Sequence, residues 1–401
     1  MAKRVPEQSR AEQCDSVIKR LKGLINASNK PTPETVLPIV KDFKVGHAES
    51  KGDPCVGCTV FLFKRGTRCV TSKLGGSVAS YCTDERDLFD DNIDELHKVD
   101  AIFFSGGSLH GLSVGGGVAE FLTKQMIDSN TLIADSMYYI PRVSGAITFA
   151  GAWGGDTQWK PPNPAMGYKA CESATTRWTS ATFRTGQHGA GASCFCGNID
   201  GVDQAYPGGQ GYAFSAFENT DVQCFAYVVL NCKGHVRRRK GGNNTTIPHH
   251  NRFQSTNVLV HTNAKFSSVE HMQQVATQIH CSMAAEITPF ACCVDGDILF
   301  LTSSENVSLS DKKVDSAVFG VFATSVLSSA IESVFIYLRI IFELKYRLRH
   351  NTRRCTLSSP NRRRSTRDRA LFRQGPHLSL NKLHTLLVLP CALCIPATIP
   401  T

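Results

Sequence analysis

The first residues, Met1–Glu7, lack the apolar run of a secretory signal peptide. The sixteen cysteines are spaced irregularly along the 401 residues, unlike the disulfide framework of a small secreted domain. These two absences predict a cytoplasmic protein whose cysteines stay reduced.

A complete set of metal ligands or phosphate-binding residues is also missing. Cys55-Val56-Gly57-Cys58 has the spacing of half a zinc site, but no second Cys or His pair lies at a suitable distance. The glycine-rich runs Gly106-Gly107-Ser108 and Gly189-Ala190-Gly191 have no lysine in the spacing of a phosphate-binding loop. We therefore expect neither a metal nor another cofactor, and we interpret these glycines as places of close backbone approach near the site.

Outside one segment, the chain has no net charge. The chain has 44 Lys and Arg against 34 Asp and Glu, and eleven of the basic residues lie between Lys345 and Arg373 with a single acid, Asp368. The remaining residues are balanced at 33 basic and 33 acidic. That segment has no helical or strand periodicity and almost no aromatic residues on which bases could stack.

We interpret residues 339–401 as a basic, disordered tail and do not expect nucleic acid as a partner. Binding of this tail to a polyanion is the alternative. Residues 1–35 form an N-terminal extension, so residues 36–338 make up the folded domain.

One long apolar run, Ala317–Leu338, could span a bilayer by its length. Glu332 and five Ser or Thr residues interrupt it, so a buried packing helix is the preferred interpretation. We expect no membrane partner.

Ser255 is the candidate nucleophile. It is the first residue of a strand that contains the apolar stretch Val258–Ala264. It follows a basic, glycine-rich segment, residues 234–253, that has the composition of an exposed loop. If its hydroxyl attacked the carbonyl of Gln254, the chain would break and Ser255 would carry both a hydroxyl and a new α-amine. An α-amine titrates near ~8 and can act as a general base at neutral pH.

Two carboxylates, Asp295 and Asp297, enter a second apolar strand, Ile298–Leu301. The segment Ser267–Ala285 between the two strands has helical periodicity, with Ser268 as its N-cap. We expect the two strands to be neighbours in one sheet, which would bring both acids close to Ser255. Other expected elements are strands at Cys58–Phe63 and Ala101–Ser105 and a helix at Gly111–Gln125.

Several sequence blocks, in order, resemble the DmpA-type L-aminopeptidase/D-esterase and β-peptidyl aminopeptidase family. The resemblance extends from about Pro38 to Phe335, and its specificity lies in the order and spacing of the blocks. The blocks are residues 45–48, 57–60, 101–112, 165–168, 189–192, 228–231, 258–264 and 295–297.

The resemblance implies an αββα sandwich of the N-terminal nucleophile hydrolase type, related to ornithine acetyltransferase, in the α/β (α+β) class. It also implies a precursor that cuts itself before a Ser or Thr, here between residues 254 and 255. Thr245 and Thr246 resemble the cut site of some relatives, but Pro248 follows and cannot donate to a central strand.

The same resemblance assigns roles to four residues. Ser255 is the nucleophile, Asn231 donates to the oxyanion, and Asp295 or Asp297 orients the α-amine or binds the amine of the substrate. The alternatives are a strand-end cap for Asn231 and a turn before a strand for the two acids.

Two positions differ from the family pattern, and one family residue has only a candidate. Gln254 stands where Gly or Asn usually precedes the cut, and Asn198 stands where some members have a lysine. Tyr168 is a candidate for the tyrosine near the oxyanion.

The expected function is that of an autoprocessing serine aminopeptidase acting on short peptides, amides or esters. The two cleaved chains would stay together, and a homo-oligomer is expected. The rivals are an acyltransferase resembling ornithine acetyltransferase and a catalytically inactive scaffold whose basic tail binds a polyanion.

Overall fold

The computed structural model describes residues 38–52, 54–87, 97–128, 140–151, 159–177, 182–201, 204–237 and 254–335. Its main feature is a nine-stranded sheet with the order β3-β5-β4-β2-β13-β11-β9-β8, and with β1 paired to β2. The central strands are β2 (Gly57–Lys73), β13 (Ile298–Ser308), β11 (Ser255–Lys265) and β9 (Gln223–Asn231).

The long strand β2 belongs to two layers of this sheet. Its first half pairs antiparallel with β1 (Phe43–Glu49) and with β4 (Lys98–Ser105). Its second half pairs antiparallel with β13, from Arg68 opposite Ser303 to Lys73 opposite Ile298. One strand therefore connects the layer of β1, β4 and β5 (Val143–Ile147) with the layer of β13, β11, β9 and β8 (Gly209–Ala216).

Aromatic side chains fill the space between the two layers. The ring of Phe61 on β2 lies 5.0 Å from that of Tyr227 on β9, and Phe104 on β4 lies 5.7 Å from Phe300 on β13. These rings are fully buried, and each such burial contributes about 1.5–3 kcal/mol. Side chains alternate along β11, so Leu259 points into this central core, whereas Val258 and Val260 point to the opposite face of the sheet.

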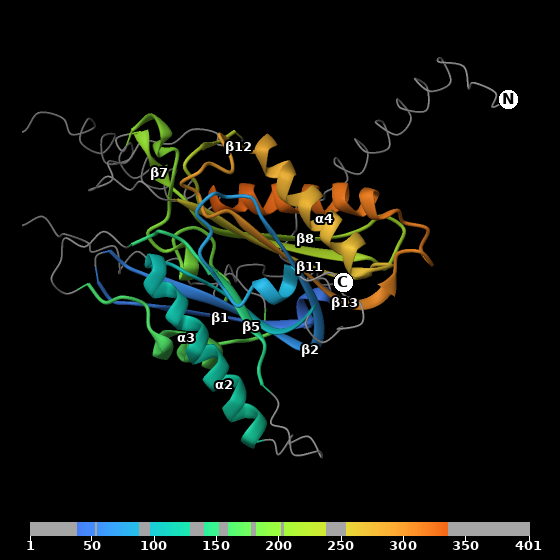
Figure 1. Cartoon of the computed structure of the whole chain (residues 1–401), viewed down its shortest axis with the longest axis horizontal. Helices are drawn as coiled ribbons and strands as arrows, with labels where there is room; N and C mark the ends of the chain where they lie inside the picture. Colours follow the sequence, from blue (N-terminus) through green and yellow to red (C-terminus); the bar gives the residue numbers. More distant parts are fainter. Residues whose placement is uncertain are drawn as a thin grey trace, which may run out of the picture. The chain divides into compact units, whose positions relative to one another are not determined.

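Helices cover the outer face of each layer (Figure 1). On one side, α2 (Val114–Asp128) and α3 (Pro164–Glu172) enclose a core with β2 and β4. On the other side, α4 (Val269–Ser282) and the helix Ser316–Phe335 pack on β9, β11 and β13. Helix, sheet, sheet and helix follow one another, which confirms the predicted αββα sandwich.

The helix Ser316–Phe335 is long and apolar enough to cross a membrane, but 67% of its most apolar stretch is buried in the fold. Phe319, Ala323 and Leu327 of this helix contribute to the core beneath it. The described part of the run thus packs against the sheet, as the sequence predicted.

Two predicted elements differ in extent. The expected helix at Gly111–Gln125 starts as the 3-10 turn η4 (Ser108–Ser113) and becomes α-helical only at Val114. The strand expected at Cys58–Phe63 continues to Lys73, because its second half gains a partner, β13, that is distant in sequence. For α4, Ser268 is the N-cap as predicted, and its hydroxyl accepts a hydrogen bond from the His271 N–H.

Shorter elements complete the fold. They are η1 (Pro38–Lys41), β3 (Ser80–Tyr81), η2 (Asp84–Asp87), η5 (Gly189–Gly191), β6 (Phe195–Cys196), η6 (Asn198–Asp200), β7 (Tyr206–Pro207), β10 (His235–Val236), η8 (Met283–Ala285) and β12 (Ile287–Thr288). Residues 1–35 and 339–401, and the rejected cut sites Thr245 and Thr246, lie outside the described residues.

Candidate active site

Ser255 is the first residue of β11, and it is buried. It is paired with Asn231, the last residue of β9, across the antiparallel β9–β11 ladder. On the other side, β11 runs parallel to β13, with Asn257 opposite Ile298. The two strands that were expected to be neighbours are therefore adjacent, and their leading ends meet at Ser255.

The carbonyl group of Gln254, which precedes Ser255, has two hydrogen-bond donors. The Ser255 Oγ lies 2.6 Å from this carbonyl oxygen and donates to it. The main-chain N–H of Gly296 donates to the same oxygen at 2.8 Å. A side-chain hydroxyl and a backbone N–H thus converge on the carbonyl oxygen of one peptide bond.

Gly296 has no room for a side chain. A Cβ at this position would lie 2.7 Å from the Ser255 Oγ and 2.9 Å from the main-chain oxygen of Ser77. The glycine therefore allows the turn Asp295-Gly296-Asp297 to approach the hydroxyl directly.

Asp297 is held beneath the start of β11 by two backbone donors. Its Oδ1 accepts a hydrogen bond of 2.6 Å from the Thr256 N–H, and its Oδ2 accepts one of 3.1 Å from the Ala291 N–H. Burial, together with the neighbouring charge of Asp295, raises the pKa of Asp297 to about 7 despite these donors. This carboxyl can therefore exchange a proton near neutral pH.

Asp295 lies beside the main chain of Gln254, to which it is bridged in parallel register. Its Oδ2 accepts the Cys292 N–H at 3.3 Å. Burial raises the pKa of Asp295, and hydrogen bonds and the charge of nearby Lys233 oppose that rise. Lys233 follows Asn231 by two residues, and sequence reasoning did not identify it.

Asn231 is anchored at one side-chain atom and open at the other. Its Oδ1 accepts the Phe195 N–H at 3.0 Å, which is the capping contact considered from the sequence. Its Nδ2 is buried and has no hydrogen-bond partner in the part of the chain that the structure describes. The capping contact fixes the amide, and the Nδ2 donor stays available to an oxygen atom in the site.

Two segments contact the candidate residues directly, the segment Leu74–Ala79 after β2 and the strand β6. The ends of β5 and β4 connect in turn to the first of these segments. The linking hydrogen bonds run from Ser77 N–H to Asp295 O, Ile147 N–H to Ala79 O, Thr148 N–H to Ser105 O and Phe195 N–H to Asn231 Oδ1.

The glycine-rich runs make close contacts, but with residues other than the four candidates. Gly107 has a φ of 82°, and a Cβ there would meet the Pro162 ring at 2.4 Å. At Gly189, with a φ of 52°, a Cβ would lie 2.5 Å from the Thr59 Oγ1.

Two further sequence candidates can be located. Asn198 begins η6, whose next residue, Ile199, donates its N–H to the Lys233 oxygen at 3.1 Å. Tyr168 lies on α3 with its ring 5.4 Å from that of Phe121 on α2, in the helical layer. Its contacts there give no support to a place beside the oxyanion.

Asn257 was not recognised from the sequence. It follows Ser255 by two residues on the same face of β11, is fully buried, and has no described partner for either amide atom. The one sign in the sequence is a polar amide side chain at a position of the strand where an apolar residue is expected.

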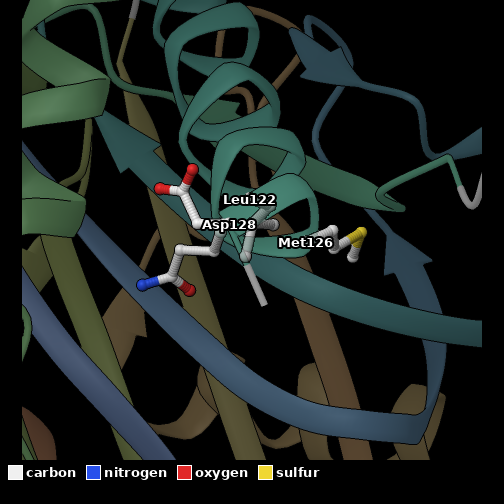
Figure 2. Close-up of a pocket in the computed structure, with 4 residues that line it drawn as sticks. Leu122, Met126 and Asp128 are labelled. Carbon is white, nitrogen blue, oxygen red and sulfur yellow. The ribbon is translucent and has the colours of Figure 1, made fainter. Parts of the chain in front are cut away.

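A hollow at the end of α2 is lined by Leu122, Gln125, Met126 and Asp128 (Figure 2). None of the four site residues lines it. Within the described ranges, no group of three or more His, Cys, Asp or Glu side chains could hold a metal ion.

Comparison with known proteins places this geometry in context. The profile described as Peptidase family S58 matches residues 39–336. A 6-aminohexanoate-oligomer endohydrolase of Kocuria sp. (strain KY2) is 29% identical over 289 residues, which cover 66% of this chain and 74% of that protein. A protein of the same name from Paenarthrobacter ureafaciens has the same identity and coverage.

Solved structures show the same fold at low sequence identity. A Burkholderia sp. beta-aminopeptidase has a TM-score of 0.53 and 17% identity, covering 77% of this chain and 88% of that one. The L-aminopeptidase D-Ala-esterase/amidase of Ochrobactrum anthropi, described as a prototype of the serine aminopeptidases and a variant of the Ntn hydrolase fold, has a TM-score of 0.52 and 15% identity. It covers 76% of this chain and 88% of that one.

Proposed function

Because the chain belongs to peptidase family S58 and is a hydrolase, we propose that it is a serine aminopeptidase that activates itself by cleavage before Ser255. The observation that carries this proposal is the contact of the Ser255 hydroxyl and the Gly296 N–H with the same carbonyl oxygen, that of Gln254. The substrates would be short peptides, amides or esters with a free amine.

Self-cleavage would begin with addition of the Ser255 Oγ to the carbonyl carbon of Gln254. Negative charge then develops on the carbonyl oxygen, where the Gly296 N–H already donates. The bond from this carbon to the Ser255 nitrogen breaks as the nitrogen takes a proton, leaving an ester. Water hydrolyses the ester, which leaves a carboxylate on Gln254 and a free α-amine and hydroxyl on Ser255.

In the cleaved protein, the α-amine of Ser255 would take the proton from its own hydroxyl as that oxygen attacks a substrate carbonyl. The Gly296 N–H and the Asn231 Nδ2, which is buried and oriented by the Phe195 N–H on its Oδ1, would both donate to the resulting oxyanion. Asp295 and Asp297 supply the negative charge that a substrate ammonium requires.

The curated relatives give a second candidate substrate class. Their names refer to oligomers of 6-aminohexanoate, whose amides have five methylenes between amine and carbonyl. Hydrolysis of such amides would also use Ser255 as the nucleophile. It would differ from aminopeptidase activity in how the protein binds the acyl part of the substrate.

The mass of the purified protein tests the proposal. We expect two associated fragments, residues 1–254 and 255–401, and a single chain for Ser255→Ala. A cut that N-terminal sequencing places before Thr245 or Thr246 would contradict the assignment of Ser255.

A further inference from the structure

Gln254 is held by the main chain of the segment that leads into β13. Its N–H donates to the Val294 oxygen at 3.2 Å, and its carbonyl oxygen accepts the Gly296 N–H at 2.8 Å. These two hydrogen bonds flank Asp295, as in a parallel strand pair. We call this pair, the Val294 oxygen and the Gly296 N–H, the main-chain clamp.

Gln254 is also the acyl residue of the bond that Ser255 would cut. Self-cleavage and substrate cleavage both place an acyl group on the same Oγ, so Gln254 shows how the site can hold an acyl residue. We propose that the main-chain clamp selects substrates whose N-terminal residue is an α-amino acid over β- and longer ω-amino acyl groups. This inference rests on the proposed aminopeptidase function and names its substrate class.

The spacing of the clamp is the first argument. The two hydrogen bonds use the nitrogen and the carbonyl of one residue, which a single carbon atom separates. A methylene inserted between them adds a bond of about 1.5 Å. A hydrogen bond of 2.8–3.2 Å does not tolerate such a displacement, because a separation of about 3.6 Å is no longer a hydrogen bond. A β-residue would therefore keep one contact and lose or strain the other.

The side chain of Gln254 gives a second argument. It is 1% exposed, yet neither its Oε1 nor its Nε2 has a hydrogen-bond partner among the residues described. The polar contacts that hold Gln254 are thus those of its main chain. A clamp of this kind recognises the spacing of the backbone rather than one particular side chain.

Charge complementarity is the third argument. A free substrate has an ammonium group where Gln254 has an amide N–H, next to the Val294 oxygen. Asp295, the residue that follows Val294, is buried and lies beside Asp297 in the same turn. An α-ammonium bound to the Val294 oxygen would lie near these carboxyl groups, which offsets its loss of water.

The test uses the self-cleaved protein and substrates with one leaving group. L-glutaminyl and L-β-homoglutaminyl p-nitroanilide share a side chain and differ by one methylene between amine and carbonyl. Glycyl, β-alanyl and 6-aminohexanoyl p-nitroanilide repeat the comparison without a side chain. Loss of one main-chain hydrogen bond should lower kcat/KM by roughly ten-fold at the first added methylene. The Ser255→Ala precursor, in which Gln254 still occupies the clamp, should hydrolyse none of them.

The possible outcomes separate the two proposals. Faster hydrolysis of both α-amino acyl compounds supports the clamp. Equal or faster hydrolysis of the β-homoglutaminyl or the 6-aminohexanoyl compound overturns it and leaves the aminopeptidase function intact. If the cleaved protein hydrolyses none of the five, the proposed function is wrong and the inference falls with it.

Discussion

Asn231 and Ser255 are directly paired across the β9–β11 ladder, so the last residue of one strand faces the first residue of the next. The same face of the sheet carries both side chains. The amide that is proposed to stabilise the oxyanion and the hydroxyl that is proposed to attack are thus positioned by a single strand pairing, not by flexible loops.

Replacement of Asn231 by alanine should lower kcat by about 10²–10³, the usual cost of losing an oxyanion donor. Asn263→Ala is the matched control, because the Asn263 Oδ1 also accepts a main-chain N–H, that of Gln223 at 2.8 Å, where β9 begins. Asn263→Ala also removes a hydrogen bond of 2.9 Å from the Asn263 Nδ2 to the Asp221 oxygen, so its Tm should fall at least as far as that of Asn231→Ala while its activity stays normal. Comparable activity in the two variants would show that Asn231 is only a cap.

Gly296→Ala should block self-cleavage, because the added methyl group would lie 2.7 Å from the Ser255 Oγ. The intact mass of the purified variant should be that of one chain. Gly116→Ala is the control, since a Cβ there meets no atom within 4 Å and alanine favours the interior of α2 by roughly 0.5–1 kcal/mol. Normal processing of Gly296→Ala would mean that the turn does not approach Ser255 this closely.

Asp297→Asn should impair both activity and stability. Asn has only one acceptor oxygen, whereas Asp297 accepts from both Thr256 and Ala291, so one buried N–H would face an NH₂ group. We expect a loss of about 1–3 kcal/mol in the free energy of unfolding. Loss of the charge should also lower kcat/KM about ten- to a hundred-fold.

Substrate acetylation checks the role of that charge. N-acetylated peptides should be poor substrates for the unmutated protein, because they lack the ammonium group. Equal cleavage of free and acetylated peptides, together with normal turnover by Asp297→Asn, would show that Asp295 and Asp297 only form a turn before a strand.

Buried histidines should make the fold sensitive to acid. Burial lowers the pKa of His47 to about 4 and that of His280 to about 3, from 6.5, so both rings are neutral in the fold. The stability that they contribute is complete above pH 6.5 and declines as the pH falls, because the unfolded chain then binds more protons. Asp297 acts in the opposite direction, since its raised pKa favours the folded state as the pH falls from about 7.

Burial also lowers the pKa of His261 and raises that of Asp295, so three histidines are set against two carboxyl groups. The net of one proton predicts that the unfolding free energy falls by roughly 1.4 kcal/mol per pH unit below pH 6. Urea titrations of the uncleaved Ser255→Ala chain between pH 7.5 and pH 5 measure this slope, because its unfolding is unimolecular, and the histidine variants are made in the same chain. His280→Gln should reduce it, whereas His110→Gln, at an exposed position, should leave it unchanged. Equal slopes for the two variants would show that His280 is not the group responsible.

Local patterns in the sequence predicted where several of the candidate residues lie in the fold. A hydroxyl at a strand start and two acids before a second strand placed Ser255, Asp295 and Asp297, because strand ends follow directly from apolar runs. The cap at Ser268 was equally visible, since capping is a contact within one turn.

Features that depend on distant pairing were not visible. The extension of β2 to Lys73 requires β13, more than two hundred residues later in the chain. The role of Gly296 depends on the approach of its turn to Gln254, and Lys233 comes near Asp295 only in the folded sheet. Asn257 had a signal, a polar residue in an apolar strand, but no local rule says which face it occupies.

The pairing of β2 with β13 affects how the cleaved protein would unfold and refold. A break between residues 254 and 255 would leave β2 and β9 in one polypeptide and β13 and β11 in the other, yet β13 and β11 lie side by side between β2 and β9 in the middle of the sheet. Neither polypeptide could leave without opening two ladders at once. Once unfolded, the two would have to meet again in solution, so recovery would become second order and would slow with dilution. Folding of the uncleaved precursor is unimolecular and does not depend on concentration. After cleavage, the lifetime of the folded protein would be set by how slowly it unfolds.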